Sequence, residues 1–250
     1  MKRMQEKKTV PVRRRSESGS AWPSLSVVIP VYNEAATISE IIRRVRTVDI
    51  PKEIIVVDDA STDGTANALQ SAAGPDLRVA RFEKNRGKGA ALREGFRLAR
   101  NEVVIVQDAD LEYDPDDYHD LLKPFADGVA DVVYGSRFLT TKSRRVLFFW
   151  HSVMNHFLTL LSNIFSDLNL TDMETCYKAF RRELIQSIDL KEDRFGFEPE
   201  VTIKLARRNV RFYEVGISYN GRSYAEGKKI RAKDAFRALY CLFKYGLFSR

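Results

Sequence analysis

The feature that most constrains this chain is a regular alternation of short β-branched runs and helical patterns between Leu25 and Gly135. We predict strands at residues 25–31, 53–59, 78–82, 102–107 and 131–135. Between them, apolar residues recur with the spacing of one helix face. Because strands joined through helices cross over the sheet, the pattern predicts an α/β fold with a mostly parallel sheet flanked by helices.

The pattern changes after Gly135, although the 250 residues still suit one large domain. We predict a helix at residues 198–208, a strand at 210–217 and a final helix at 231–245. A polar, basic tail at residues 1–24 is expected to be disordered. The domain is therefore expected to cover residues 25–250, divided into halves at 25–138 and 139–250.

Residues 146–165 are the one segment close to the length that spans a bilayer. On a helix its polar residues form one stripe, and apolar residues cover the remaining surface. This pattern is typical of an amphipathic helix that lies on a membrane surface and does not cross it. The alternative is a helix whose apolar side faces the protein's own core.

The formal charge of +7 is concentrated at the two ends of the chain. Residues 1–24 carry a net +5 and residues 222–250 a net +6, which leaves −4 for the residues between them. Basic ends around an acidic body favour an anionic membrane surface or ligand over nucleic acid, although the first tail could simply aid solubility. The first 24 residues lack the apolar run of a secretory signal, and two distant cysteines fit a reducing compartment. We expect a cytoplasmic protein held peripherally at the cytoplasmic face of a membrane.

Acidic residues follow the predicted strands, where open parallel sheets bind ligands. Asp58 and Asp59 end the second strand, and Asp108, Asp110 and Glu112 follow the fourth. If the chain stays extended beyond Gln107, the last three carboxylates share one side and call for a cation. Hard oxygen ligands select Mg²⁺ or Mn²⁺. The alternative is a solvated turn that caps a helix beginning at Pro115.

Other phosphate-binding patterns are weak or missing. The P-loop pattern and GxGxxG are both absent. The sequence NRGKGAAL at residues 85–92 places two glycines and Lys88 at a helix start, which could approach a diphosphate or be a plain turn. No Ser/His/Asp order suggests an acyl-transfer triad.

Five segments occur in the order seen in one enzyme family: VVIPVYNEAATI, IIVVDDASTDGT, NRGKGAALREGF, VQDADLEYDP and VYGSRF. Over residues 25–138 the chain thus resembles the family-2 glycosyltransferases of the GT-A fold, which is Rossmann-like. Three later segments, DMETCYKAFRR, FGFEPEV and YNGRSYAEGKK, look like the branch with dolichol-phosphate mannosyltransferases and bacterial polyprenyl-phosphate glycosyltransferases.

The resemblance implies roles for individual positions. The nucleotide would be bound by Pro30, Tyr32, Glu34, Asp58, Asp59, Lys88 and Asp108. The divalent ion would be held by Asp108, Asp110 and Glu112, and the catalytic positions would be Asp110, Arg137, Arg222 and Asp172. The acceptor phosphate would meet Arg144, Arg145, Lys228 and Lys229.

The implied reaction is inverting transfer of a sugar from a nucleotide diphosphate donor, GDP-mannose or a UDP-hexose, to a polyprenyl monophosphate. Such an acceptor is already largely ionised at neutral pH, since its second pKa is about 6. A family-2 enzyme acting on a sugar or protein hydroxyl would instead need a general base, with Asp172 or Glu174 as candidates. Asp172 could equally brace a loop through Arg181 or Arg182. A non-catalytic nucleotide-sugar sensor or membrane scaffold is the rival from another class.

Overall fold

A seven-stranded mixed sheet forms the centre of the molecule, with strand order β3-β2-β1-β4-β6-β5-β7. The computed structural model describes residues 22–139, 145–146, 148–222 and 232–248. The strands are β1 (Leu25–Val31), β2 (Lys52–Asp58), β3 (Leu77–Arg81), β4 (Val103–Val106), β5 (Val132–Ser136), β6 (Lys178–Arg181) and β7 (Phe212–Gly216). Neighbouring strands run parallel except at β6, which is antiparallel to both β4 and β5.

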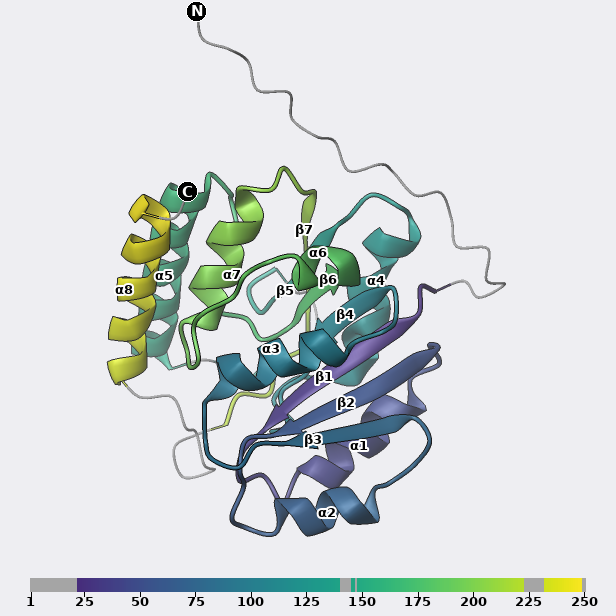
Figure 1. The fold of residues 1–250 in the computed structure, drawn as a ribbon. Coiled ribbons are helices and arrows are strands. Elements are labelled where there is room, and N and C mark those ends of the chain that lie inside the picture. The colour runs from purple at the N-terminus through teal and green to yellow at the C-terminus, as the bar shows by residue number, and fades with distance from the viewer. Residues whose placement is uncertain (1–21, 140–144, 147, 223–231, 249–250) are drawn as a thin grey trace, which may run out of the picture.

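Helices cover both faces of this sheet (Figure 1). In the first half they are α1 (Ile38–Thr47), α2 (Thr65–Ser71), α3 (Lys88–Leu98), the 3₁₀ turn η1 (Pro115–Asp117) and α4 (Tyr118–Ala126). In the second half they are α5 (Phe149–Ser166), α6 (Arg182–Gln186), α7 (Phe197–Ala206) and α8 (Ala232–Phe248). Helices α5, α7 and α8 pack on one another beside the sheet (Figure 1).

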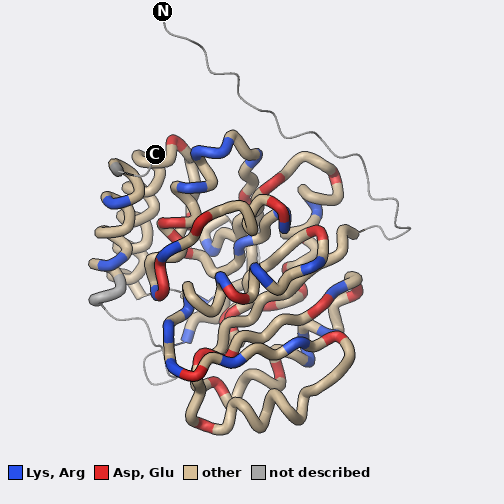
Figure 2. Tube along the Cα trace, in the orientation of Figure 1, with Lys and Arg blue, Asp and Glu red and all other residues tan. Residues whose placement is uncertain are grey.

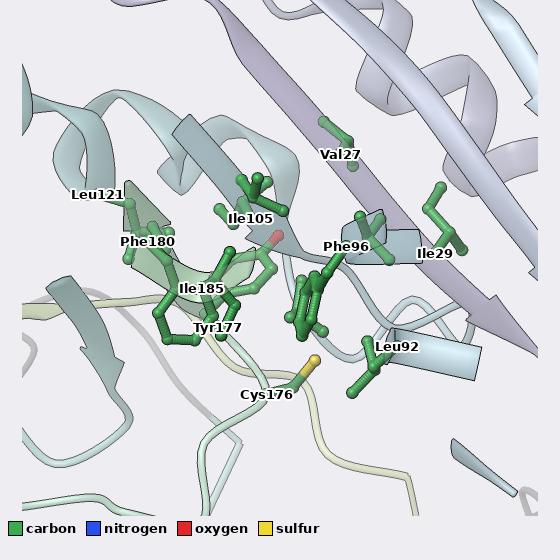
Figure 3. Packing of buried hydrophobic residues seen from close by; sticks show 14 of the residues in the cluster. Val27, Ile29, Leu92, Phe96, Ile105, Leu121, Cys176, Tyr177, Phe180 and Ile185 are labelled. Carbon is green, nitrogen blue, oxygen red and sulfur yellow. The ribbon is translucent and has the colours of Figure 1, made fainter. Parts of the chain in front are cut away.

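One part of the core lies between the sheet and α3, and the same cluster includes buried residues of α1 and α4. Val28 of β1 packs against α3, where a Cβ added at Gly95 would collide with the Val28 side chain. On the same helix Leu92 and Phe96 point into the core, and the Phe96 ring meets the Phe180 ring of β6 edge-on with centroids 6.0 Å apart (Figure 3). All five residues are buried. Strands β1, β2 and β4 are covered on both faces, so most of their side chains are buried and apolar.

The prediction of an α/β fold with a mostly parallel sheet is confirmed. The segments β6 and α6 were not predicted, because β6 has four residues and carries a charge at each end. The described chain begins at Trp22, whose ring meets His119 edge-on at 5.1 Å, and Ser24 accepts a hydrogen bond from the Glu102 amide at 3.2 Å. Residues 22–24 thus pack against the domain, and residues 1–21 lie outside the described part of the chain.

Candidate functional site

The carboxyl ends of β1 and β2 present the acidic residues that the sequence singled out. The Asp59 carboxylate accepts hydrogen bonds from the amides of Arg86 at 2.6 Å and Gly87 at 2.7 Å. Asp58 accepts one from the Ser61 amide at 2.9 Å. Both carboxylates are buried, so they fix the loops around this end of the sheet. Acidic and basic residues are interspersed around it (Figure 2).

The other residues predicted for the nucleotide lie on the same edge. Pro30 is within the ladder opposite Val57 of β2. Tyr32 is 41% exposed, and Glu34 contacts the Arg222 guanidinium at 3.3 Å. The structure therefore brings Tyr32 and Glu34 beside the ends of β1 and β2.

The turn at residues 85–89 carries Lys88 into the site. Gly87 has a φ of +102°, a conformation that residues with a Cβ rarely adopt. The Lys88 ammonium lies 2.8 Å from Asp108 Oδ1 and 3.7 Å from Glu198 Oε1. Burial alone would lower the pKa of Lys88, but the charges of Asp108 and Glu198 raise it well above its usual value. Lys88 is thus a permanent cation beside the first acidic residue after β4.

The three acidic residues after β4 come together through a turn, not through an extended chain. Strand β4 ends at Val106, and Leu111 has a φ of +63°. The Arg222 guanidinium nevertheless lies 2.9 Å from Asp110 Oδ2 and 3.5 Å from Glu112 Oε1. The alternative, in which this segment caps the next helix, does not describe it, since Asp114 provides that cap.

The positive charge near Asp110 does not offset the effects of burial and of the neighbouring carboxylates. Burial, together with the charges of Asp108 and Glu112, raises the pKa of Asp110 to about 7, although the Arg222 charge and the hydrogen bond from the Glu112 amide oppose that rise. A further cation beside Asp108 and Asp110 would relieve this repulsion, and their oxygens are the hard ligands that Mg²⁺ and Mn²⁺ prefer. Within the described residues, no group of three or more His, Cys, Asp or Glu side chains is arranged to hold a metal ion. The residues present thus fit an ion that takes its remaining ligands from water and a substrate diphosphate.

Glu112 forms hydrogen bonds with the segment at residues 219–222. Its Oε2 accepts a hydrogen bond from the Tyr219 hydroxyl at 2.8 Å, and its Oε1 accepts one from the Arg222 amide at 2.8 Å. The Glu112 carbonyl also accepts from the Asn220 amide at 2.9 Å. Glu112 therefore holds the segment 219–222, which places Arg222 against Asp110.

A second charged group forms around Arg137, directly after β5. The Asp172 carboxylate accepts hydrogen bonds from Arg137 Nε and Nη2, each at 2.7 Å, and from the Arg137 amide at 3.1 Å. Burial opposes ionisation of Asp172, but the Arg137 guanidinium holds its pKa below the usual range. Asn155 of α5 contacts both partners, at 3.0 Å and 3.2 Å. We predicted that Asp172 could brace a loop through Arg181 or Arg182. The partner is wrong, because Asp172 forms its ion pair with Arg137.

Tyr219 connects the two charged groups. The Arg137 guanidinium lies over its ring, 5.2 Å from the centroid, while its hydroxyl bonds Glu112. Arg137 and Arg222, 85 positions apart in sequence, are thus joined through one tyrosine and one carboxylate. The sequence analysis missed Tyr219, although it belongs to the YNGRSYAEGKK segment.

Sequence reasoning also missed a buried lysine near the same site. Lys178 of β6 is fully buried and donates hydrogen bonds to the carbonyls of Met173 and Thr175. Burial and the charge of Glu198 raise the pKa of the nearby Glu174 to about 8, which Lys178 only partly offsets. This rise favours the protonated form of Glu174 at neutral pH, which disfavours it as a proton acceptor. A lysine within the apolar run CYKAF was the signal that could have identified this cluster.

Of the four residues predicted to meet the acceptor phosphate, Arg145 is the one that lies within the described part of the chain. Arg145 donates to the Gly221 carbonyl at 3.1 Å, next to Arg222. Arg144, Lys228 and Lys229 lie outside the described residues.

Helix α5 turns its polar stripe toward the protein and its apolar residues outward. Asn155 and Thr159 bond groups of the 170–173 loop, whereas Phe149 and Trp150 are 69% and 76% exposed. The exposed apolar residues of α5 and α8 are Phe149, Trp150, Val153, Met154, Phe157, Leu160, Ile164, Phe236, Tyr240, Phe243 and Leu247. Among the described residues, no helix has both the length and the apolar character needed to cross a bilayer.

Comparison with known proteins agrees with this geometry. Residues 26–189 match the family model described as Glycosyl transferase family 2. An undecaprenyl-phosphate mannosyltransferase of Micrococcus luteus is 32% identical over 215 residues, which cover 80% of this chain and 85% of that protein. An undecaprenyl-phosphate 4-deoxy-4-formamido-L-arabinose transferase of Pseudomonas paraeruginosa is 30% identical, and the match spans 82% of this chain but only 60% of the relative.

Solved structures share the fold at lower identity. Glucosyl-3-phosphoglycerate synthase from Mycobacterium tuberculosis, in complex with Mn²⁺, uridine diphosphate and phosphoglyceric acid, superposes with a TM-score of 0.71 at 22% identity, covering 91% of this chain and 80% of that one. Mannosyl-3-phosphoglycerate synthase from Rubrobacter xylanophilus gives 0.68 at 20% identity, covering 89% and 72%. Both likenesses concern the arrangement of sheet and helices.

Proposed function

Because the chain belongs to glycosyl transferase family 2, we propose that it transfers a sugar, with inversion, from a nucleotide diphosphate donor to a polyprenyl monophosphate. The observation that carries this proposal is the convergence of Arg137 and Arg222 through Tyr219 and Glu112, directly beside Asp110. Two arginines beside a carboxylate site suit a reaction in which two phosphate groups meet. Similarity to the two undecaprenyl-phosphate transferases supports the same acceptor class.

The donor is proposed to bind across the ends of β1 and β2. Pro30, Tyr32 and Glu34 would line one side of the nucleotide, and the loops fixed by Asp58 and Asp59 the other. Lys88 and Asp108 would meet the diphosphate and its sugar. GDP-mannose and a UDP-hexose are both compatible donors.

Asp108 and Asp110 are the residues that would hold a divalent ion, Mg²⁺ or Mn²⁺. When bound, the ion would supply Lewis-acid stabilisation of the charge on the leaving diphosphate. Arg222 supplies positive charge to the same carboxylate, at 2.9 Å from Asp110. Glu112 is assigned to holding the segment that carries Arg222.

The acceptor side requires cationic positioning and no general base. A phosphate monoester with a second pKa near ~6 already presents an anionic oxygen at neutral pH. Arg137 is held by a bidentate pair with Asp172, so it is oriented before any acceptor arrives. Asp172 is fully buried and bound by Arg137, and the raised pKa of Glu174 favours its protonated form, which disfavours both as the base that a hydroxyl acceptor would need.

The membrane surface is proposed to meet α5 and α8. Exposed aromatic and aliphatic residues gather on these two packed helices, and such a group is typical of an interaction surface. Asn155 of α5 contacts Arg137, so a lipid-bound acceptor arriving along α5 would reach the arginine directly. The proposed location is therefore peripheral, on the cytoplasmic face of the membrane.

A donor screen tests the proposal. Purified protein is incubated with Mg²⁺ or Mn²⁺, a short polyprenyl phosphate and labelled GDP-mannose, UDP-glucose, UDP-galactose or UDP-N-acetylglucosamine. We expect one donor to label the lipid, and Arg137→Gln to reduce that labelling at least about a hundredfold, as expected for loss of a charged donor to the phosphate. Failure of every donor to label lipid, with label entering a sugar or protein hydroxyl, would overturn it.

A further inference from the structure

The side chain of Glu192 joins α8 to the loop that precedes α7. Its carboxylate accepts hydrogen bonds from Arg237 Nε at 3.1 Å, Lys244 Nζ at 2.9 Å and the Tyr245 hydroxyl at 2.8 Å. The side chain is 2% exposed, while those of Arg237 and Lys244 are 49% and 37% exposed. One buried carboxylate thus collects three donors from a single helix.

The backbone of the same segment forms a wall behind the turn at residues 85–89. The Asp193 carbonyl accepts from the Ala90 amide at 3.1 Å, and the Glu192 carbonyl accepts from Arg93 Nη1 at 2.7 Å. A Cβ added at Gly87 would collide with the Asp193 carbonyl oxygen, and one at Gly89 with the Glu192 carbonyl oxygen. The turn and the 192–194 segment are therefore in backbone contact.

The turn at residues 85–89 also positions residues that are proposed to bind the donor. The amides of Arg86 and Gly87 hold the Asp59 carboxylate, and Lys88 holds Asp108. A continuous path of hydrogen bonds and backbone contacts thus runs from α8 through Glu192 to Asp59, which follows β2, and to Asp108, which follows β4. Figure 1 shows α8 and the start of α3 on the same side of the sheet.

We infer that Glu192 is a positioning residue that ties α8 to the donor-binding turn, so that the placement of α8 sets the affinity for the nucleotide diphosphate. The inference rests on the proposed function, because it takes this turn to be part of the donor site. It adds a coupling between the helix that carries exposed Phe236 and Phe243 and a site on another part of the fold. Glu192 does not contact the donor itself.

Calorimetric titration of the full chain with UDP and GDP in Mg²⁺ tests this coupling. Glu192→Gln removes the charge, and the double variant Arg237→Met/Lys244→Met removes two partners on α8 without altering the turn. We expect Kd for the preferred diphosphate to rise about tenfold in the first variant and about fivefold in the second, within the usual range of coupling between sites. The turnover number at saturating donor should change less than threefold. Glu183→Gln, which removes the charge of an exposed carboxylate paired with Arg182 on α6, is the matched control and should keep the wild-type Kd.

The outcomes separate the coupling from the proposed function. A loss of thermal stability in both variants with an unchanged Kd would overturn the inference, since a purely structural role moves only the melting temperature. If Glu192→Gln does not fold, the double variant decides, because its side chains are half-exposed and its backbone is unchanged. If the wild type binds diphosphate and the variants raise Kd as expected, but the wild type labels no lipid, the proposed acceptor is overturned and the coupling remains. Absence of diphosphate binding in the wild type would overturn both.

Discussion

Replacing Asp172 by Asn tests whether this residue orients Arg137 or acts as a base. The change keeps the shape of the side chain and removes its charge, leaving the buried Arg137 guanidinium without its counter-ion. Removing one partner of a buried pair costs about 3 to 5 kcal/mol. Because Asn retains one neutral acceptor for Arg137, we expect a loss of unfolding free energy of about 3 kcal/mol, which lowers Tm by roughly 6 to 12 °C for a chain of this size.

The effect on catalysis separates the two roles. If Asp172 only orients Arg137, a small displacement of the guanidinium should reduce kcat/KM by about 10- to 100-fold. The acidic limb of the pH–rate profile should stay near pH ~6, because it belongs to the phosphate acceptor. The assay is lipid labelling between pH 5 and 8 at a temperature where the variant is folded. The exposed Asp189, whose carboxylate lies 3.3 Å from Lys191 Nζ, gives the control Asp189→Asn, which should be indistinguishable from wild type.

A loss of about a thousandfold or more, together with disappearance of the acidic limb, would refute this reasoning. It would identify Asp172 as a general base and favour a hydroxyl acceptor. Retention of wild-type stability would also contradict the account, because it would mean that the pair with Arg137 is not formed in solution.

Three more predictions follow from the contacts around the site and the exposed helices. Burial opposes ionisation of Glu192, but Lys244, Arg237 and Tyr245 hold its pKa at about 2. The stabilisation that the ionised carboxylate gives the fold is therefore complete above pH 4.5 and is lost as pH falls toward 2. In acid unfolding followed by circular dichroism, the free energy of unfolding of Glu192→Gln should fall by about 1 to 2 kcal/mol less over this range than that of the wild type, after allowance for the solvent around the partners of Glu192. Gly87→Ala should cost at least about 3 kcal/mol in chemical denaturation and Gly64→Ala about 1 kcal/mol, because both have a positive φ but only Gly87 faces a backbone collision; equal costs would contradict the close approach. Trp150→Ser should weaken binding to anionic vesicles about tenfold in a sedimentation assay, and Tyr213→Ser, altered on β7 at 42% exposure, should not; equal effects would argue against a membrane contact at α5.

The parts of the fold that could be read from the sequence are those set by local patterns. The runs 25–31 and 53–59 predicted β1 and β2 within one residue, because buried parallel strands are continuous apolar segments. The acidic residues at their ends could be placed at one edge of the sheet for the same reason. Strand β6 could not be predicted, since its pairing with β4 and β5 depends on contacts between residues far apart in sequence.

The parts of the site that escaped prediction depend on three-dimensional neighbours. Tyr219 matters because its ring meets Arg137 and its hydroxyl meets Glu112, and no spacing in the sequence shows either contact. Glu192 reads as one acidic residue in a charged loop, yet it is buried by α8. The polar stripe predicted in 146–165 falls on α5, and the sequence could not show which side packs inward; in the structure that side includes Asn155.

The most direct test of the proposed reaction compares two acceptors that differ only in the phosphate. Wild-type protein receives the labelled donor selected in the screen, a divalent ion and either a polyprenyl phosphate or the corresponding polyprenol. If Arg137 and Arg222 position a phosphate for attack, label will enter the phosphate lipid alone. Equal labelling of the polyprenol, or labelling of the polyprenol only, would contradict the proposed chemistry.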